Sequence, residues 1–192
     1  HQTRRGHTPL IIASKNGYEG VVQALLAKGA KVNLQNREGS TALMEASMNG
    51  YTEIVKILLE RGATIDLRNQ KRSTALMMAA LKKHIGIVQA LLAHGADITL
   101  QNKYGYTALT EACRSGDEEI VKVLLAKDAK IEHQDRNGQT PLTLVSDRGH
   151  AQLAKFLLAH GANINHRNKN GDTALILSSL YRHTEIAKAL LA

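Results

Sequence analysis

Aromatic residues are scarce in this 192-residue sequence, which has no tryptophan, one phenylalanine and five tyrosines. A core must therefore consist of Leu, Ile, Val, Ala and Met side chains, which suit small, closely packed helices. The single cysteine, Cys113, excludes an internal disulfide, and the sequence has no Asn-x-Ser/Thr glycosylation site. These absences favour a reducing, intracellular setting. We expect a cytoplasmic location, with the nucleus or delivery into a host cell as alternatives that the sequence leaves open.

Long hydrophobic runs are also absent. No apolar run approaches the roughly 18 to 20 residues needed to span a bilayer, so we expect no membrane insertion. The N-terminus has no signal-peptide pattern. An apolar content of 43% and a charged content of 22% are typical of a folded chain rather than a disordered one. The formal net charge of +8 leaves nucleic acid, acidic lipid and acidic protein surfaces open as partners.

The sequence consists almost entirely of internal repeats. The tripeptide Thr-(Pro/Ala)-Leu recurs every 33 residues without insertion or deletion, at Thr8, Thr41, Thr74, Thr107, Thr140 and Thr173. We interpret residues 1–192 as a single array of six repeats, the last of them incomplete. The approximate repeat ranges are 3–35, 36–68, 69–101, 102–134, 135–167 and 168–192.

The second repeat illustrates the structure that each unit predicts. Residues 36–39, Asn-Arg-Glu-Gly, have the preferences of a type I β-turn. Thr41 stands where a helix N-cap belongs, and the helix over residues 42–49 ends before Gly50. A second helix over residues 52–62 carries apolar residues on one face, and an extended segment leads to the next turn. Both helices are shorter than the roughly 12 to 15 residues that make an isolated helix marginal, so the repeats must stack into a solenoid.

The repeated pattern resembles the ankyrin repeat. Its elements are D/N-x-x-G-x-T-P/A-L-x-x-A-x-x-x-G, then I-V-x-x-L-L-x-x-G-A-x-V/I-N/D, at a period of 33 residues. The resemblance implies an all-α solenoid with a turn and two antiparallel helices per repeat and a concave face formed by turns and first helices. The sequence departs from the family's T-P-L-H at the fourth place, where Ile, Met or Thr stands. The histidine network of that place is therefore absent, and we expect packing to substitute for it.

The last repeat keeps the apolar pattern of the others. It carries Ile186, Ala187, Leu190 and Leu191, where a solenoid end would need polar residues for solubility. We infer that the sequence is an excerpt of a longer protein, and the alternative is a natural terminal repeat that tolerates exposed apolar surface.

Motifs of enzymes and metal sites are not found in the sequence. There is no G-x-x-x-x-G-K, G-x-S-x-G, H-E-x-x-H or C-x-x-C, so we expect no enzyme, no cofactor and no metal. Cys113 occupies a small-residue place of the first helix and is interpreted as a packed residue. Two pairs of histidines stand at matching places of the repeat, His133 with His166 and His94 with His160. Matching places of neighbouring repeats lie about 8 to 10 Å apart, and His94 and His160 are two repeats apart, so all four are interpreted as surface residues rather than metal ligands.

Function is expected at the places that the repeat does not dictate. The second place of the turn reads Arg4, Arg37, Gln70, Lys103, Arg136 and Lys169, which predicts a basic stripe or merely a solvated rim. Apolar residues stand at first-helix places that face the groove, namely Met48, Met78, Leu81, Leu144, Leu177 and Leu180. Such residues tend to mark interaction sites, although they are also compatible with packing against a neighbouring helix or a flanking region.

These places define a predicted protein-binding site. It centres on repeats two and three and includes residues of repeat four, where Tyr and Arg are typical binding hot spots. Its residues are Arg37, Glu45, Met48, Lys71, Arg72, Met78, Leu81, Lys82, Tyr104, Tyr106, Glu111 and Arg114. Repeat three is unusual because Arg72 and Lys83 stand where most other repeats have glycine. If these positions need a positive φ, each substitution costs about 1 kcal/mol.

The leading hypothesis is a protein–protein interaction module, which the resemblance also implies. In this hypothesis a monomeric array captures a segment of a partner protein, with acidic residues as a possible complement. One alternative is binding of nucleic acid or another acidic surface through the basic rim, against which stands the shortage of aromatic stacking residues. The other alternative is a regulatory array within a larger enzyme or channel.

Overall fold

The structure is a computed structural model that describes residues 3–192, in which twelve α-helices and no strands are found. The all-α architecture predicted from the sequence is confirmed. The first two residues of the predicted array lie outside the described part. The chain forms two compact units, His1–Lys103 and Tyr104–Ala192. None of the twelve helices is both long enough and apolar enough to cross a bilayer.

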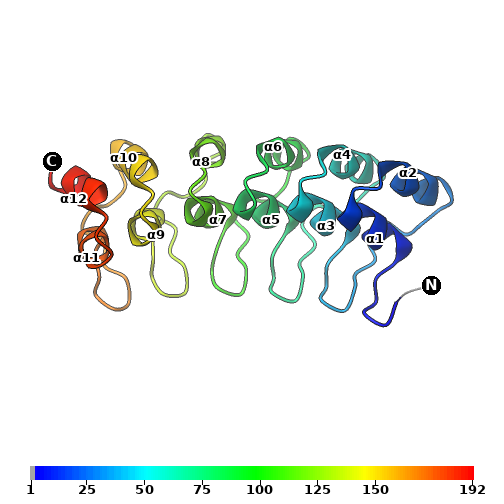
Figure 1. Ribbon diagram of the computed structural model, residues 1–192, viewed down its shortest axis with the longest axis horizontal. Coiled ribbons are helices and arrows are strands. Elements are labelled where there is room, and N and C mark those ends of the chain that lie inside the picture. Colours follow the sequence, from blue (N-terminus) through cyan, green and yellow to red (C-terminus); the bar gives the residue numbers. More distant parts are fainter. Residues whose placement is uncertain (1–2) are drawn as a thin grey trace. The chain divides into compact units, whose positions relative to one another are not determined.

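The first unit contains six helices in two rows (Figure 1). One row contains the first helix of each repeat, α1 (Pro9–Asn16), α3 (Ala42–Asn49) and α5 (Ala75–Leu81). The other row contains the second helices, α2 (Glu19–Ala27), α4 (Thr52–Glu60) and α6 (Ile85–Ala93). Neighbouring helices within each row are in contact, and each first helix also packs on its own second helix. The turns project beyond the row of first helices.

The second unit repeats the same plan. Its first helices are α7 (Ala108–Ser115), α9 (Pro141–Arg148) and α11 (Ala174–Leu180). Its second helices are α8 (Glu118–Leu125), α10 (Ala151–Ala159) and α12 (Thr184–Leu191). α9 contacts both α7 and α11, and α10 contacts α12.

A threonine begins every first helix, as the sequence predicts. In each case the hydroxyl oxygen accepts a hydrogen bond from the backbone N–H three residues on, which satisfies one of the unpaired donors of the first turn. In repeat four the Thr110 hydroxyl also accepts from the Thr107 backbone N–H at 2.7 Å, which closes a capping box. The first helices are therefore fixed at their N-termini by local chemistry.

The turns bind neighbouring repeats together within each unit. The Asn36 side-chain oxygen accepts from the backbone N–H groups of Glu38 and Ser40, which shapes the turn. The N–H of the second turn residue then donates to the carbonyl of the preceding turn. In the first unit these bonds include Arg37 to Arg5 at 3.0 Å and Gln70 to Glu38 at 2.9 Å, and in the second unit Arg136 to Tyr104 at 3.0 Å. The backbone polar groups of the turns are thus used in contacts between repeats, whereas the turn side chains remain available for binding.

The core is aliphatic, as the shortage of aromatic residues predicts. Leu43 and Leu58 are fully buried in the first unit, as are Leu109 and Leu124 in the second. The fourth place of the T-P-L motif is filled by buried Ile11, Met44, Met77, Thr110 and Thr143. Packing therefore substitutes for the missing histidine at Ile11, Met44 and Met77, as predicted. The Thr110 and Thr143 hydroxyls instead donate to the carbonyl oxygens of the threonine caps three residues earlier, at 3.0 and 2.9 Å. Ile176, at the same place of repeat six, is instead 45% exposed.

Two glycine positions of the repeat require a left-handed backbone. Gly39 has φ 76° and Gly50 has φ 84°, and repeat three adopts the same conformation with Arg72 at 60° and Lys83 at 64°. The positive φ considered for Arg72 and Lys83 is therefore observed. An L side chain in this region costs about 1 kcal/mol or more, so repeat three carries backbone strain that repeat two avoids.

Candidate functional site

An open pocket of about 340 Å³ lies in the first unit, where α3 and α5 meet the turns of repeats two and three. Met48 from α3 and Met78 and Leu81 from α5 supply its apolar lining, while Lys71 from the turn and Lys82 at the end of α5 add charge. Met48 is 42% exposed and Leu81 is 38% exposed. Five of the predicted site residues thus line one hollow. We call it the Met48–Met78 pocket.

The other predicted residues of the first unit lie elsewhere on the same repeats. Arg37 is exposed in the turn of repeat two, and its backbone N–H is held by the preceding turn. Glu45 lies half-buried on α3, and Arg72 is exposed in the turn of repeat three. None of these three is among the residues that line the Met48–Met78 pocket.

The predicted residues of repeat four form a cluster in the second unit. The Tyr104 and Tyr106 rings lie with centroids 5.8 Å apart, and the Arg114 guanidinium lies over the Tyr106 ring at 4.5 Å. Arg114 Nη1 donates to Glu111 Oε2 at 2.6 Å. Glu111 is only 5% exposed, so its role is to hold Arg114 rather than to offer an open carboxylate. We call these four residues the Tyr106–Arg114 cluster.

The electrostatics of this cluster follow from its burial. Partial removal from water raises the pKa of the Tyr106 hydroxyl, and the nearby Arg114 charge partly offsets the shift. A charge-assisted hydrogen bond such as Arg114–Glu111 is stronger than a neutral one. The guanidinium is therefore fixed between a carboxylate and an aromatic ring, in a geometry that combines an ion pair with a cation–π contact.

The apolar first-helix residues of the last two repeats differ in how exposed they are. Leu144 and Leu177 are 2% and 4% exposed, so they are packed inside the second unit and do not form accessible surface. Leu180 is largely exposed. An apolar residue at these places therefore forms accessible surface only in some repeats.

Histidines that the sequence interpretation passed over connect neighbouring repeats. His84, His150 and His183 follow the first helix of their own repeat, and each Nε2 lies 3.2 to 3.4 Å from a carbonyl oxygen near the end of the preceding first helix. Because a carbonyl only accepts, Nε2–H is the donor. The same ring covers the glycine that ends that helix, and a Cβ added at Gly50 would lie 2.7 Å from His84 Cε1. In the sequence, an aromatic or histidine residue recurs just after this glycine, and that recurrence could have predicted the contact.

The interpretation of His133 and His166 as surface residues is wrong. Both are partly buried, and their Nε2 atoms donate to the carbonyl oxygens of Gly105 and Gly138, each at 2.7 Å. They thus tie the end of a repeat to the turn at its start. His94 and His160 are exposed as expected, and the ring Nδ1 of each donates to the carbonyl four residues earlier, at 2.8 Å.

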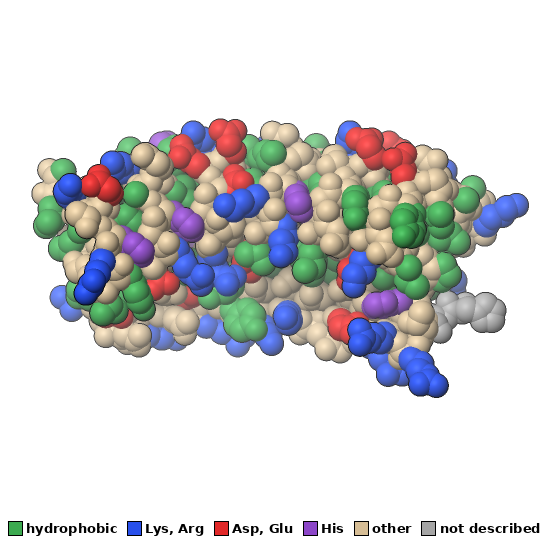
Figure 2. Space-filling model, in the orientation of Figure 1, with side chains coloured by type: hydrophobic (Ala, Val, Ile, Leu, Met, Phe, Trp, Pro, Cys, Tyr) green, Lys and Arg blue, Asp and Glu red, His purple; other side chains and the backbone are tan. Residues whose placement is uncertain are grey.

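The turns of both units carry mostly basic side chains at their second place. All six residues at the second turn place are exposed, and five of them are Lys or Arg. Figure 2 shows Lys and Arg side chains at the turns of each unit. Residues 3–192 contain no group of three or more His, Cys, Asp or Glu side chains arranged to hold a metal ion. Cys113 is fully buried, which raises the pKa of its thiol and makes it a poor nucleophile.

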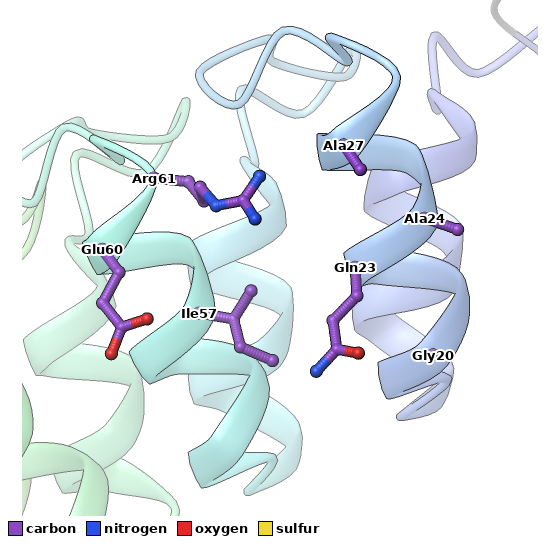
Figure 3. A pocket seen from close by; sticks show the side chains of 7 residues that line it. All are labelled: Gly20, Gln23, Ala24, Ala27, Ile57, Glu60 and Arg61. Atoms are coloured by element: carbon purple, nitrogen blue, oxygen red, sulfur yellow. The ribbon is translucent and has the colours of Figure 1, made fainter.

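A second pocket of about 530 Å³ lies between the second helices α2 and α4 (Figure 3). Gln23 of α2 and Ile57 of α4 extend into the space between the two helices. Gly20, Ala24 and Ala27 form much of the α2 wall. Because these residues are small, the hollow follows from missing side-chain volume and does not by itself indicate a ligand.

Comparison with known proteins identifies the family to which this structure corresponds. A search of curated proteins gave no match. The family model described as "Ankyrin repeats (3 copies)" matches residues 1–69, 63–135 and 128–192. These matches span both compact units and agree with the stacked helix pairs, the threonine caps and the glycine turns. The chain belongs to the ankyrin-repeat family.

Proposed function

We infer that this chain captures a segment of a partner protein on the surface that its first helices and turns form. Ankyrin repeats are generally protein–protein interaction modules and typically non-enzymatic scaffolds. The observation that supports the proposal most is the Met48–Met78 pocket, because three long apolar side chains remain accessible there. Exposed apolar patches tend to mark interaction sites, and methionine adapts to differently shaped partners.

Binding by this surface relies on preorganisation. The turns are held by side-chain and inter-repeat backbone hydrogen bonds, and the first helices are capped by threonine. A surface fixed in this way loses little conformational entropy when a partner binds. Met48, Met78 and the lysines have long unbranched side chains with many rotamers, so adaptation to a partner is confined to side chains at the contact surface.

The Tyr106–Arg114 cluster is proposed as a second contact area. Tyr104 is exposed and Tyr106 half-buried, and the Arg114 side chain is held in place by Glu111. Tyrosine and arginine are enriched among residues that dominate binding energy. Each area is proposed on its own evidence, and either can be tested without the other.

Affinity capture followed by mass spectrometry tests the proposal. The Met78→Asp and Tyr106→Ala variants are compared with the unchanged chain and with Val21→Asp, which places the same charge on an exposed apolar position of α2. We expect Met78→Asp and Tyr106→Ala each to lose partners that Val21→Asp retains, with the helical circular-dichroism signal intact. Equal capture by all four proteins would contradict the proposal.

The basic turn residues support a second candidate, binding of nucleic acid. Five of the six exposed second-place side chains supply positive charge, but tyrosine rings on which bases could stack stand in the turn of repeat four alone, at Tyr104 and Tyr106. If this candidate holds, affinity for RNA or DNA falls steeply and linearly on a log–log plot against salt. Binding that survives high salt would instead favour the protein partner.

A further inference from the structure

The Met48–Met78 pocket has a charge pattern that narrows the class of partner. Lys71 and Lys82 both line it, and neither ammonium group has an ion pair within residues 3–192. Glu38 is the one acidic residue of the lining, and its Oε2 lies 3.9 Å from His7 Nε2 on the preceding turn. The pocket thus combines an accessible apolar lining with two lysines and one carboxylate, which leaves the lining with a net positive charge.

Repeat three concentrates positive charge at this pocket despite the strain in its backbone. At the places where repeat two has Glu38, Gly39, Asn49 and Gly50, repeat three has Lys71, Arg72, Lys82 and Lys83. Arg72 and Lys83 directly follow the two lining lysines, and both have positive φ. Asp128 and Arg182 show that a single such residue is tolerated elsewhere. Only repeat three replaces both the turn glycine and the first-helix glycine, and strained residues tend to cluster where function needs them.

We propose that this pocket binds a peptide segment in which one long apolar side chain, of the Leu, Met or Phe class, is flanked by acidic residues on both sides. This assignment rests on the proposed function and specifies its ligand. The volume of about 340 Å³ is near the lower end of ligand pockets, which span about 300 to 1,000 Å³. It therefore suits a side-chain anchor rather than a large folded element. Carboxylates beside the anchor reach Lys71 and Lys82, which steer and orient the segment.

The apolar lining distinguishes this ligand from a polyanion. A phosphate backbone would use the lysines but would leave Met48, Met78 and Leu81 without a partner, and the lining has no aromatic ring on which a base stacks. A purely apolar peptide would leave both ammonium groups unmatched. Only a segment with both features uses the whole lining.

Selection from a library of short random peptides, panned on the full chain, tests the proposed ligand. We expect enriched peptides to share an apolar residue with Asp or Glu on each side. Fluorescein-labelled peptides with a central Leu between pairs of Glu are then measured by anisotropy, beside matched peptides with a central Ser or with Lys in place of Glu. Both matched peptides should bind roughly tenfold more weakly or worse.

Variants of the chain locate the binding. Met78→Asp should lower the affinity for the Leu–Glu peptide roughly tenfold or more. Met48→Asp provides the same test at an exposed position, in case the half-buried Met78 variant unfolds. The double change Lys71→Glu with Lys82→Glu should weaken the Leu–Glu peptide roughly fivefold at low salt and strengthen the Leu–Lys peptide. Val21→Asp should change none of these values.

The outcomes separate this inference from the proposed function. Enriched peptides that lack acidic residues, or that bind unchanged to Met48→Asp and Met78→Asp, overturn the inference and leave the proposed function standing. An RNA or heparin probe that displaces the peptide, together with an unchanged affinity after Leu is replaced by Ser, also overturns it, in favour of a general anion surface. No enrichment of any peptide, combined with equal protein capture by all variants, overturns both.

Discussion

Repeats two and three, neighbours in the first compact unit, meet the same backbone requirement with different residues. Gly39 and Gly50 adopt the left-handed conformation in repeat two, and Arg72 and Lys83 adopt it in repeat three. The helices around these positions have nearly the same bounds within their repeats. The repeat therefore dictates the backbone conformation at these positions and only favours glycine, so other residues can stand there at a cost in stability.

The repeats also differ in the side chain that lies against the glycine that ends the first helix. The His84 ring covers Gly50 and the Tyr51 ring covers Gly17, so a Cβ at either glycine would lie within 3 Å of ring carbon. Repeat four, which follows Lys83 in the sequence, has Asp117 where these rings stand. The Asp117 carboxylate instead caps α8 by accepting from the Ile120 N–H at 2.9 Å. Glycine at this place therefore supplies room for a ring as well as a left-handed backbone.

The largest effect is expected for Gly39→Ala. A Cβ there would lie 2.9 Å from the Gln70 nitrogen and 3.0 Å from Asn69 Cα, which are backbone atoms that cannot move without disturbing the bond from Gln70 N–H to Glu38. Strain and overpacking together should lower the free energy of unfolding by about 2 to 4 kcal/mol. Urea denaturation followed by circular dichroism gives this value.

Gly62→Ala is the matched control in the same repeat. Gly62 has φ 77°, close to that of Gly39, but a Cβ there would meet nothing within 4 Å. We expect a loss of about 1 kcal/mol, from backbone strain alone. Equal losses for the two variants would show that close packing of the turns does not contribute.

A smaller loss is expected for Gly50→Ala, because the obstructing atoms belong to a side chain. The His84 ring can rotate away, at the expense of its hydrogen bond to the Met48 carbonyl. The expected loss is about 1 to 3 kcal/mol. In a double-mutant cycle with His84→Ala, the two losses should fall short of additivity by about 1 kcal/mol. Additive losses would mean that the ring and the glycine do not interact.

Arg72→Gly and Lys83→Gly should instead raise the free energy of unfolding. Each relieves a positive φ that an L side chain tolerates poorly, while glycine increases the freedom of the unfolded chain. The net gain in the free energy of unfolding should be about 0.5 to 1 kcal/mol per change. The Leu–Glu peptide should bind the double variant more weakly, since two positive charges near the pocket are lost. Asp128→Gly, in the second unit, should raise stability similarly and leave peptide binding unchanged.

Sequence reasoning recovered the fold because the repeat carries strong local signals. The threonine caps, the turn asparagines and the glycine ends each act through bonds to backbone atoms a few residues away. The burial of Leu144 and Leu177, by contrast, depends on which parts of the structure pack against them, and the 33-residue pattern does not encode that. The bonds of His133 and His166 to Gly105 and Gly138 join positions 28 residues apart. Such pairs become visible only when the turn geometry is known.

The smallest predicted effect is a pH dependence with opposite signs in the two repeats. Burial raises the pKa of Asp66, in repeat two, from its ordinary value of 3.8, and the Asp97 carboxylate adds to the shift while a hydrogen bond from the Asp97 N–H opposes it. The folded state then holds this proton to higher pH than the unfolded state. The contribution of Asp66 is thus most favourable at acid pH and is lost as the pH rises above 3.8 through the raised pKa.

The pKa of Asp97, in repeat three, is lowered by hydrogen bonds from the Thr99 hydroxyl and N–H. Its contribution is present above its ordinary value of 3.8 and is lost as the pH falls through the lowered pKa. Asp66→Asn should therefore make the stability of the chain rise more steeply with pH just above 3.8, and Asp97→Asn should flatten the rise just below 3.8. Thermal unfolding at closely spaced pH values measures both slopes. Changes of the same sign in the two variants would show that the carboxylates act as one coupled pair, since the Asp97 N–H binds Asp66 directly.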